Sequence, residues 1–146
     1  MDLDRTVIVF IVAVLLVETG RSDRAFTLLK NWAVRDPSNP EARIELARLY
    51  EEFGDVASAK TQLTESLQID SLNPRAWNAL ARLREQSGEY SQALANYQQS
   101  YSLNAFQPEV AERIAALSRS LGSSGTTAPG GPTDTRVVNA TTNVPR

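Results

Sequence analysis

The chain has 146 residues, of which 42% are hydrophobic and 22% are charged, and its formal net charge is −2 at pH 7. These values are ordinary for one globular domain, and the balanced charge offers no basic surface, so we expect no nucleic-acid partner. The absence of histidine and cysteine excludes Ser-His-Asp and Cys-His catalysis, a cysteine-based metal site and a disulfide. Because a glycine-rich phosphate loop is also missing, we predict a protein that is not an enzyme and that holds no metal or cofactor.

The first predicted element is an apolar run of eleven residues, 7–17. A helix that crosses a membrane needs about 20 apolar residues, and a secretory signal has a positive leader and a small-residue cleavage site. Acidic Asp2, Asp4 and Glu18 flank this run instead. We therefore interpret the run as a helix packed within the domain, with a truncated or half-inserted membrane anchor, or a strand, as alternatives. We accordingly expect a cytoplasmic protein, with membrane anchoring or export through this stretch as the alternative.

The chain from residue 21 to residue 121 has apolar residues at steps of three and four, which is the period of a helix. Segments 36–40 and 70–74 predict turns, because a proline disfavours helix in the residue before it. Asp55 stands where its side chain can cap the helix that follows. The predicted helices cover residues 21–35, 40–53, 56–69, 74–87, 89–103 and 108–121.

Glycine, alanine and proline recur at intervals of 34 residues, which indicates a tandem array. The series are Gly20, Gly54, Gly88 and Gly122, then Ala13, Ala47, Ala81 and Ala115, then Pro40, Pro74 and Pro108. We therefore predict an all-α fold, an α-solenoid of three helix-turn-helix repeats (6–39, 40–73 and 74–107) with a capping helix at 108–121, in a repeat domain that covers 6–122. The tail, 123–146, is rich in Ser, Thr, Gly and Pro with little that is apolar, so we predict that it is disordered.

These repeats resemble the tetratricopeptide repeat, a helix-turn-helix unit of 34 residues. The matching residues are Trp77, Leu80, Ala81, Ala93 and Tyr97 in the third repeat, Leu46, Ala47, Tyr50, Ala59 and Leu63 in the second, and Val12, Ala13, Leu16, Ala25 and Leu29 in the first. Arg84 and Arg43 depart from the pattern, because the family has Tyr and Trp there. The resemblance implies a right-handed superhelix whose concave groove, lined mainly by the first helix of each pair, holds a partner peptide or helix. We therefore expect a non-catalytic adaptor or scaffold that binds another protein in this groove.

The resemblance also says which residues this groove presents. The candidate binding residues are Glu45, Arg48, Arg75, Asn78, Arg82 and Arg113, with Ile44, Glu51, Glu52, Ala79, Glu85, Glu112 and Ala116 on the same surface. Arg48 and Arg82 occupy the same slot of successive repeats and could, with Asn78, grip a peptide backbone or a carboxylate. The alternative is pairing within each helix, of Arg48 with Glu51 and Glu52, and of Arg82 with Glu85.

Some members of the family hold the C-terminal carboxylate of chaperone tails with Lys and Asn side chains. The matching positions here are Phe10, Val14, Glu45, Arg75 and Ala79, and only Arg75 has the required charge, so we do not expect that mode of binding. An alternative function uses the apolar first helix, 7–17, for assembly or membrane association. In that case the residues that contact another copy or a membrane would be Val7, Phe10, Ile11 and Val14.

Overall fold

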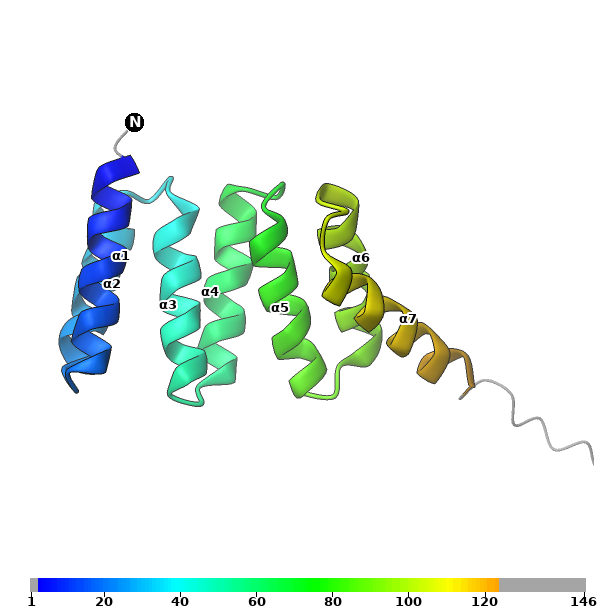
Figure 1. Cartoon of the computed structure of the whole chain (residues 1–146). Coiled ribbons are helices and arrows are strands. Elements are labelled where there is room, and N and C mark those ends of the chain that lie inside the picture. Colours follow the sequence, from blue (N-terminus) through cyan, green and yellow to red (C-terminus); the bar gives the residue numbers. More distant parts are fainter. Residues whose placement is uncertain (1–2, 124–146) are drawn as a thin grey trace, which may run out of the picture.

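The protein forms a row of seven helices over residues 3–123, the residues that the computed structural model describes (Figure 1). The helices are α1 (Leu3–Glu18), α2 (Ser22–Arg35), α3 (Pro40–Glu52), α4 (Val56–Ile69), α5 (Pro74–Gln86), α6 (Tyr90–Leu103) and α7 (Pro108–Ser123). They follow one another in chain order, with α1 at one end of the row and α7 at the other. The predicted all-α solenoid is confirmed, and residues 3–123 contain no strand.

Seven of the twelve ends of the six helices predicted after residue 20 coincide with the observed ends, and four differ by one residue because the residue there caps the helix from outside. Arg21 and Glu89 are the N-caps of α2 and α6, whereas Phe53 and Ser87 are the C-caps of α3 and α5. The capping helix is longer than predicted, since α7 continues through Gly122 to Ser123. The predicted disordered tail therefore does not begin at Ser123, and its remainder, 124–146, lies outside the described residues.

A glycine turn joins the two helices of each pair. Gly20, Gly54 and Gly88 have φ values of +72°, +78° and +77°. Glycine has no Cβ and adopts this left-handed conformation without strain, which lets the chain reverse directly after a helix. Gly122 does not have a positive φ, because no helix packs back onto α7 within the described residues and no reversal is needed there.

Asparagine and proline begin the first helix of the second and third repeats. The side chains of Asn39 and Asn73 accept hydrogen bonds from the first amides of α3 and α5, and Pro40 and Pro74 occupy the first helical position. Proline costs no hydrogen bond there because that amide has no partner within the helix. The predicted cap at Asp55 is confirmed, since its carboxylate accepts a hydrogen bond from the amide of Ser58 at 3.0 Å.

The buried apolar side chains form three clusters, each of which joins the two helices of a pair to the first helix that follows, and alanines are among the most buried members. The alanines with no exposed surface are Ala25, Ala42, Ala59, Ala76, Ala81 and Ala93. Such small side chains let helix axes approach to the low end of about 8–10 Å. A buried serine repeats the same contact in successive pairs: Ser66 Oγ donates to the carbonyl of Pro40 at 3.2 Å, and Ser100 Oγ donates to that of Pro74 at 2.8 Å.

The first helix, α1, is covered on one side only. Ala13 is buried in a cluster with residues of α2 and α3, whereas Ile8, Val12 and Leu15 stay exposed. The apolar run is therefore a helix of the repeat array, as predicted. Within residues 3–123, every helix is too short or too polar to cross a membrane.

Candidate functional site

The first helices of the pairs, α3 and α5, and the capping helix α7 are joined by ion pairs between an arginine and a glutamate of the preceding first helix. We call the surface formed by α1, α3, α5 and α7 the first-helix face. Arg75 of α5 binds Glu41 and Glu45 of α3, Arg82 of α5 binds Glu51 of α3, and Arg113 of α7 binds Glu85 of α5. Of the six predicted binding residues, Glu45, Arg75, Arg82 and Arg113 belong to these ion pairs. Arg48 joins them through its own ion pair with Glu45, and Asn78 takes no part.

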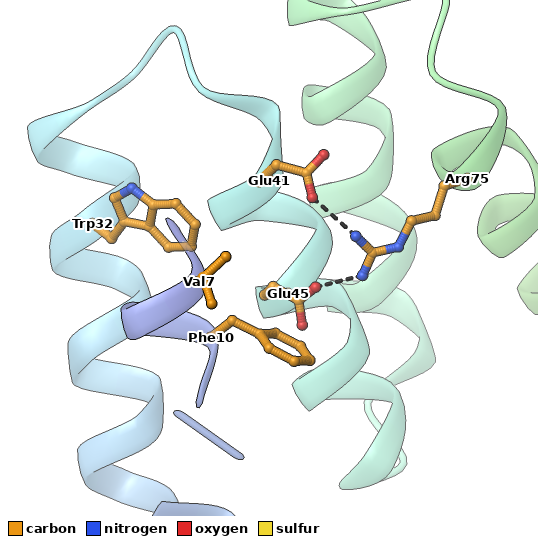
Figure 2. Close-up of a pocket in the computed structure, with 6 residues that line it drawn as sticks. All are labelled: Val7, Phe10, Trp32, Glu41, Glu45 and Arg75. Atoms are coloured by element: carbon orange, nitrogen blue, oxygen red, sulfur yellow. Dashed lines mark hydrogen bonds and ion pairs between the residues drawn. The ribbon is translucent and has the colours of Figure 1, made fainter. Parts of the chain in front are cut away.

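Arg75 binds two glutamates, and one of them, Glu45, is the most buried carboxylate of this network (Figure 2). Arg75 Nη1 lies 2.9 Å from Glu41 Oε2, and its Nη2 binds Glu45 Oε1. The Glu45 side chain is only 4% exposed, and its second oxygen accepts from Arg48 Nε at 3.0 Å. A buried carboxylate needs this compensation, because removing a charge from water is costly unless charged donors replace the lost hydration. Glu45 therefore holds two arginines in place and is not itself open to a ligand.

The other two pairs are bidentate and leave the arginine outermost. Arg82 Nη2 and Nε lie 2.6 and 3.2 Å from the two oxygens of Glu51, and both donors of Arg113 contact Glu85. The side chains of Arg75, Arg82 and Arg113 are 55%, 53% and 54% exposed, whereas the paired glutamates are more buried. A ligand on this face would consequently meet guanidinium groups, because the carboxylates lie behind them.

The alternative pairing of Arg48 with Glu51 and Glu52, and of Arg82 with Glu85, is wrong. Arg48 binds Glu45 rather than Glu51 or Glu52, and Arg82 binds Glu51 of the neighbouring helix. The reason is that a guanidinium of the following first helix contacts both oxygens of each glutamate. Arg82 does so at Glu51, and Arg113 does so at Glu85. Arg82 and Arg113 thus bind glutamates of the preceding first helix, whereas Arg48 binds a glutamate one turn back in its own helix.

Two further groove predictions have different outcomes. Ile44 is buried in the core with Ala47 and Leu63, so placing it on the groove surface was wrong. It lies one residue, about 100° of helix rotation, from Glu45 and so points toward α4. Asn78 is half-buried between Arg75 and Arg82 on α5, and its side chain makes no hydrogen bond with any residue in 3–123.

A hollow of about 160 Å³ opens on the first-helix face at the α1 end (Figure 2). Its lining residues are Val7, Phe10, Trp32, Glu41, Glu45 and Arg75. The guanidinium of Arg48 also lies over the Phe10 ring, 5.5 Å from its centre. The hollow thus has an apolar wall from α1 and α2 and a charged wall from α3 and α5.

Sequence reasoning missed this hollow. Val7 and Phe10 were expected to contact another copy or a membrane, and Glu41 was not considered. The signal for Glu41 was present, because Glu41 and Arg75 occupy the same slot in successive repeats and have opposite charges. A periodic sequence places equivalent slots side by side, so opposite charges there predict an ion pair.

A second hollow of about 320 Å³ lies at the α7 end of the face, lined by Arg82, Glu85, Gln86, Tyr90 and Arg113. Behind it the Tyr97 hydroxyl donates to Glu85 Oε2 at 3.0 Å. Burial, and then this carboxylate, raise the pKa of Tyr97 to about 12. Glu85 also raises the pKa of Arg113 above its ordinary value. These groups act as fixed hydrogen-bond donors and acceptors.

The first-helix face offers hydrogen-bond donors and an apolar hollow. These groups are complementary to a ligand that has hydrogen-bond acceptors and apolar side chains. Guanidinium groups and the Asn78 amide supply donors, and the hollow beside Phe10 supplies an apolar wall. Within residues 3–123 no group of three or more acidic side chains is arranged to hold a metal ion.

Comparisons with known proteins agree with this architecture. Two sequence models described as tetratricopeptide repeat match residues 16–83 and 74–107. No curated protein sequence matches the chain. Among solved structures, the first TPR of Spaghetti (RPAP3) bound to the HSP90 peptide SRMEEVD has a TM-score of 0.71 at 16% identity, covering 84% of this chain and 97% of that one.

Two further solved structures are similar to this chain. The type III secretion chaperone SycD of Yersinia enterocolitica, in complex with a peptide of the translocator YopD, has a TM-score of 0.70 at 18% identity, covering 81% of this chain and 95% of that one. MamA has a TM-score of 0.67 at 21% identity, covering 75% of this chain and 64% of that one. At these identities the likeness shows a shared fold of stacked helix pairs.

Proposed function

We propose, from the premise that this chain belongs to the tetratricopeptide repeat family, that it is a non-catalytic protein-interaction module whose first-helix face binds a peptide or helix of another protein. Two of the similar structures are complexes with peptides, one with an HSP90 peptide and one with a YopD peptide. The family therefore supports the class of partner, and the residues of this face support the place of binding.

The observation that carries the proposal is the row of half-exposed arginines. Each guanidinium has five N–H donors, and the glutamate behind it occupies about two of them. The remaining donors of Arg75, Arg82 and Arg113 are held in fixed positions by these ion pairs. Fixed donors lose little conformational entropy when a ligand binds, which favours affinity. Backbone carbonyls and carboxylates are the acceptors that suit them.

The ligand we propose has an apolar side chain near one end of the bound segment. The hollow beside Val7, Phe10 and Trp32 would receive that side chain, and the half-buried Asn78 amide would bind the ligand backbone. A clamp for a terminal carboxylate fits poorly, because Phe10 is apolar and the carboxylate of Glu45 lies beside Arg75. We therefore propose an internal segment of a partner, and not a free chaperone tail, as the ligand.

Binding can be tested with peptides selected from a random display library against the full chain. Fluorescence anisotropy would then compare the wild type with the double variant Arg48→Ala/Arg82→Ala and with Asn78→Ala. We expect about tenfold or greater weakening of Kd in each variant, which corresponds to about 1.4 kcal/mol. The matched control is Arg24→Ala, because Arg24 is exposed on α2, away from this face.

Circular dichroism would show whether each variant keeps its helices. Selected peptides that bind both variants as tightly as the wild type would refute binding at this face. Peptides weakened equally by Arg24→Ala would show a general effect of positive charge and would also count against the proposal.

A further inference from the structure

The outer side of α1 has an apolar stripe that nothing in residues 3–123 covers. Ile8, Val12 and Leu15 follow one another at steps of four and three, and they are 58%, 40% and 53% exposed. We call these three residues the α1 stripe. Ile11, which is 49% exposed, lies beside them in the slot of Glu45 and Arg113 and belongs to the first-helix face. The α1 stripe is separate from the hollow on the first-helix face, which Val7 and Phe10 line.

The repeat register shows what the α1 stripe corresponds to. One, two and three repeats later, the positions of Ile8, Val12 and Leu15 hold Ala42, Leu46 and Leu49, then Ala76, Leu80 and Leu83, then Val110, Ile114 and Leu117. In α3 and α5 none of these side chains is more than 3% exposed. In α7 they are buried or half-buried. The same slots are therefore interior positions everywhere else in the array.

In each case, the second helix of the preceding pair covers these slots. In α3 they pack with α2, in α5 with α4, and in α7 with α6, which are the second helices of the preceding pairs. The covering residues are Ala25, Leu29 and Ala33 in α2, Ala59, Leu63 and Leu67 in α4, and Ala93 and Tyr97 in α6. Each covering helix thus has an alanine followed four residues later by a large apolar side chain.

We propose that the α1 stripe is a docking surface for an amphipathic partner helix with this pattern, an alanine followed at the fourth and eighth positions by apolar residues. The partner helix would lie on α1 as α2 lies on α3 and α4 on α5. Its alanine allows the close approach, and its leucine fills the space between the branched side chains of Ile8 and Val12. The surface does not overlap the first-helix face, so this inference can fail without affecting the function proposed there.

Other parts of a second copy fit the α1 stripe less well. Pairing two α1 stripes would oppose branched Ile, Val and Leu on both sides, with no small residue to bring the axes together. The exposed side of α7 has Ala115, Ser118 and Arg119, so stacking it on α1 would remove polar groups from water. A helix of the α2, α4 or α6 type carries neither disadvantage.

The test supplies such a helix from the chain itself. A copy of residues 55–73, which contains α4 and the turn that leads into α5, is joined directly before Thr6, which occupies the slot of Pro74 two repeats earlier. The rest of the chain is retained, and the covalent link gives the helix a high effective concentration at α1. The control fusion is identical except that the added copy carries Ala59→Glu and Leu63→Glu.

Thermal unfolding and the fluorescence of an apolar dye report on docking. We expect the fusion to unfold at least about 5 °C above the control fusion, and to bind several-fold less dye than the control. If the two fusions have the same midpoint and bind the same amount of dye, the α1 stripe does not accept this kind of helix and the proposal is wrong.

The unmodified chain tests the other occupants. Sedimentation would be measured for the wild type and for Val12→Lys, alone and with vesicles of phosphatidylcholine and phosphatidylglycerol. Self-association or vesicle binding that Val12→Lys abolishes would assign the stripe to a second copy or to lipid and overturn the proposal. A wild type that stays monomeric and leaves the vesicles unbound supports the helix partner.

Discussion

Replacing Ala81 with leucine tests the packing between the third pair of helices and α7. Ala81 has no exposed surface and lies in α5 in a cluster with Tyr97 of α6 and Val110 and Leu117 of α7. Leucine adds three carbon atoms at a point where protein interiors are already close-packed. The added atoms must force neighbouring helices apart or move side chains from their preferred rotamers. We expect a loss of about 1–3 kcal/mol in the free energy of unfolding.

Urea denaturation followed by circular dichroism measures this loss. With a slope of about 2 kcal/mol per molar urea, the midpoint should fall by about 0.5–1.5 M. In a thermal melt the same change should lower the midpoint by roughly 4 °C for each kcal/mol. The slope of the urea transition should stay unchanged, since a changed slope would mean that the repeats no longer unfold together.

The matched control is Ala115→Leu. Ala115 occupies the same slot as Ala81 one repeat later, but it is exposed on α7. The same added atoms meet no neighbour there, so we expect a change within about 0.5 kcal/mol. An Ala81→Leu variant as stable as the wild type, or equal losses at both positions, would refute the reasoning from burial.

Three other substitutions test separate features. Gly54→Ala should lower the free energy of unfolding by about 1–2 kcal/mol, measured by urea denaturation, because Gly54 has a φ of +78°. Gly122→Ala should instead stabilise α7 by about 0.5 kcal/mol. A lower stability in both variants would contradict this difference in backbone conformation. Ser66→Ala should lower the free energy of unfolding by about 1 kcal/mol, because the fully buried hydroxyl donates a hydrogen bond to the Pro40 carbonyl that the variant loses. An unchanged urea midpoint would show that this hydrogen bond contributes nothing. Tyr97→Phe should flatten the decrease in stability at alkaline pH. The pKa of Tyr97 is raised from 10.0 to about 12, so the folded state keeps a proton that the unfolded chain releases, and wild-type stability falls as the pH rises through this interval; thermal melts across this range that give parallel curves for the two proteins would refute the assignment.

The ion pairs on the first-helix face connect binding to the stacking of repeats. Arg75, Arg82 and Arg113, which we propose as ligand contacts, are each held by a carboxylate of the preceding first helix. The relative position of two repeats thus determines where the guanidinium stands. Substitutions at the alanine contacts between pairs should for this reason weaken peptide binding even though they lie outside the face.

The glycine and proline positions made most of the fold predictable. A left-handed turn suits glycine at Gly20, Gly54 and Gly88, and a proline at the start of a helix is one of the few places where the missing amide costs nothing. These preferences act within a few residues, so they can be read from a linear sequence. Gly122 keeps the interval without the left-handed turn, since no helix within residues 3–123 packs back onto α7.

The binding surface was less predictable, because side-chain charges choose partners in space. The family resemblance placed Arg48, Arg75, Arg82 and Arg113 on one face, but the only ion pairs expected were those of Arg48 and Arg82 along their own helices. Glu41 and Arg75 have opposite charges and occupy the same slot of successive repeats, so the sequence could have predicted their ion pair. The hollow beside Phe10 had no comparable signal, since its wall combines residues of four helices.

The amino-acid sequence by itself determined the kind of element, the length of the repeat and the order of the helices. It did so because helix period, capping and turn conformation depend on residues close together in the chain. Only the tertiary structure decided which glutamate each arginine binds, that Ile44 is interior, and that the α1 stripe lacks the cover its equivalents have in α3, α5 and α7. Those outcomes depend on which surfaces meet when helix pairs stack, and a contact between residues about one repeat apart leaves no mark on local preference.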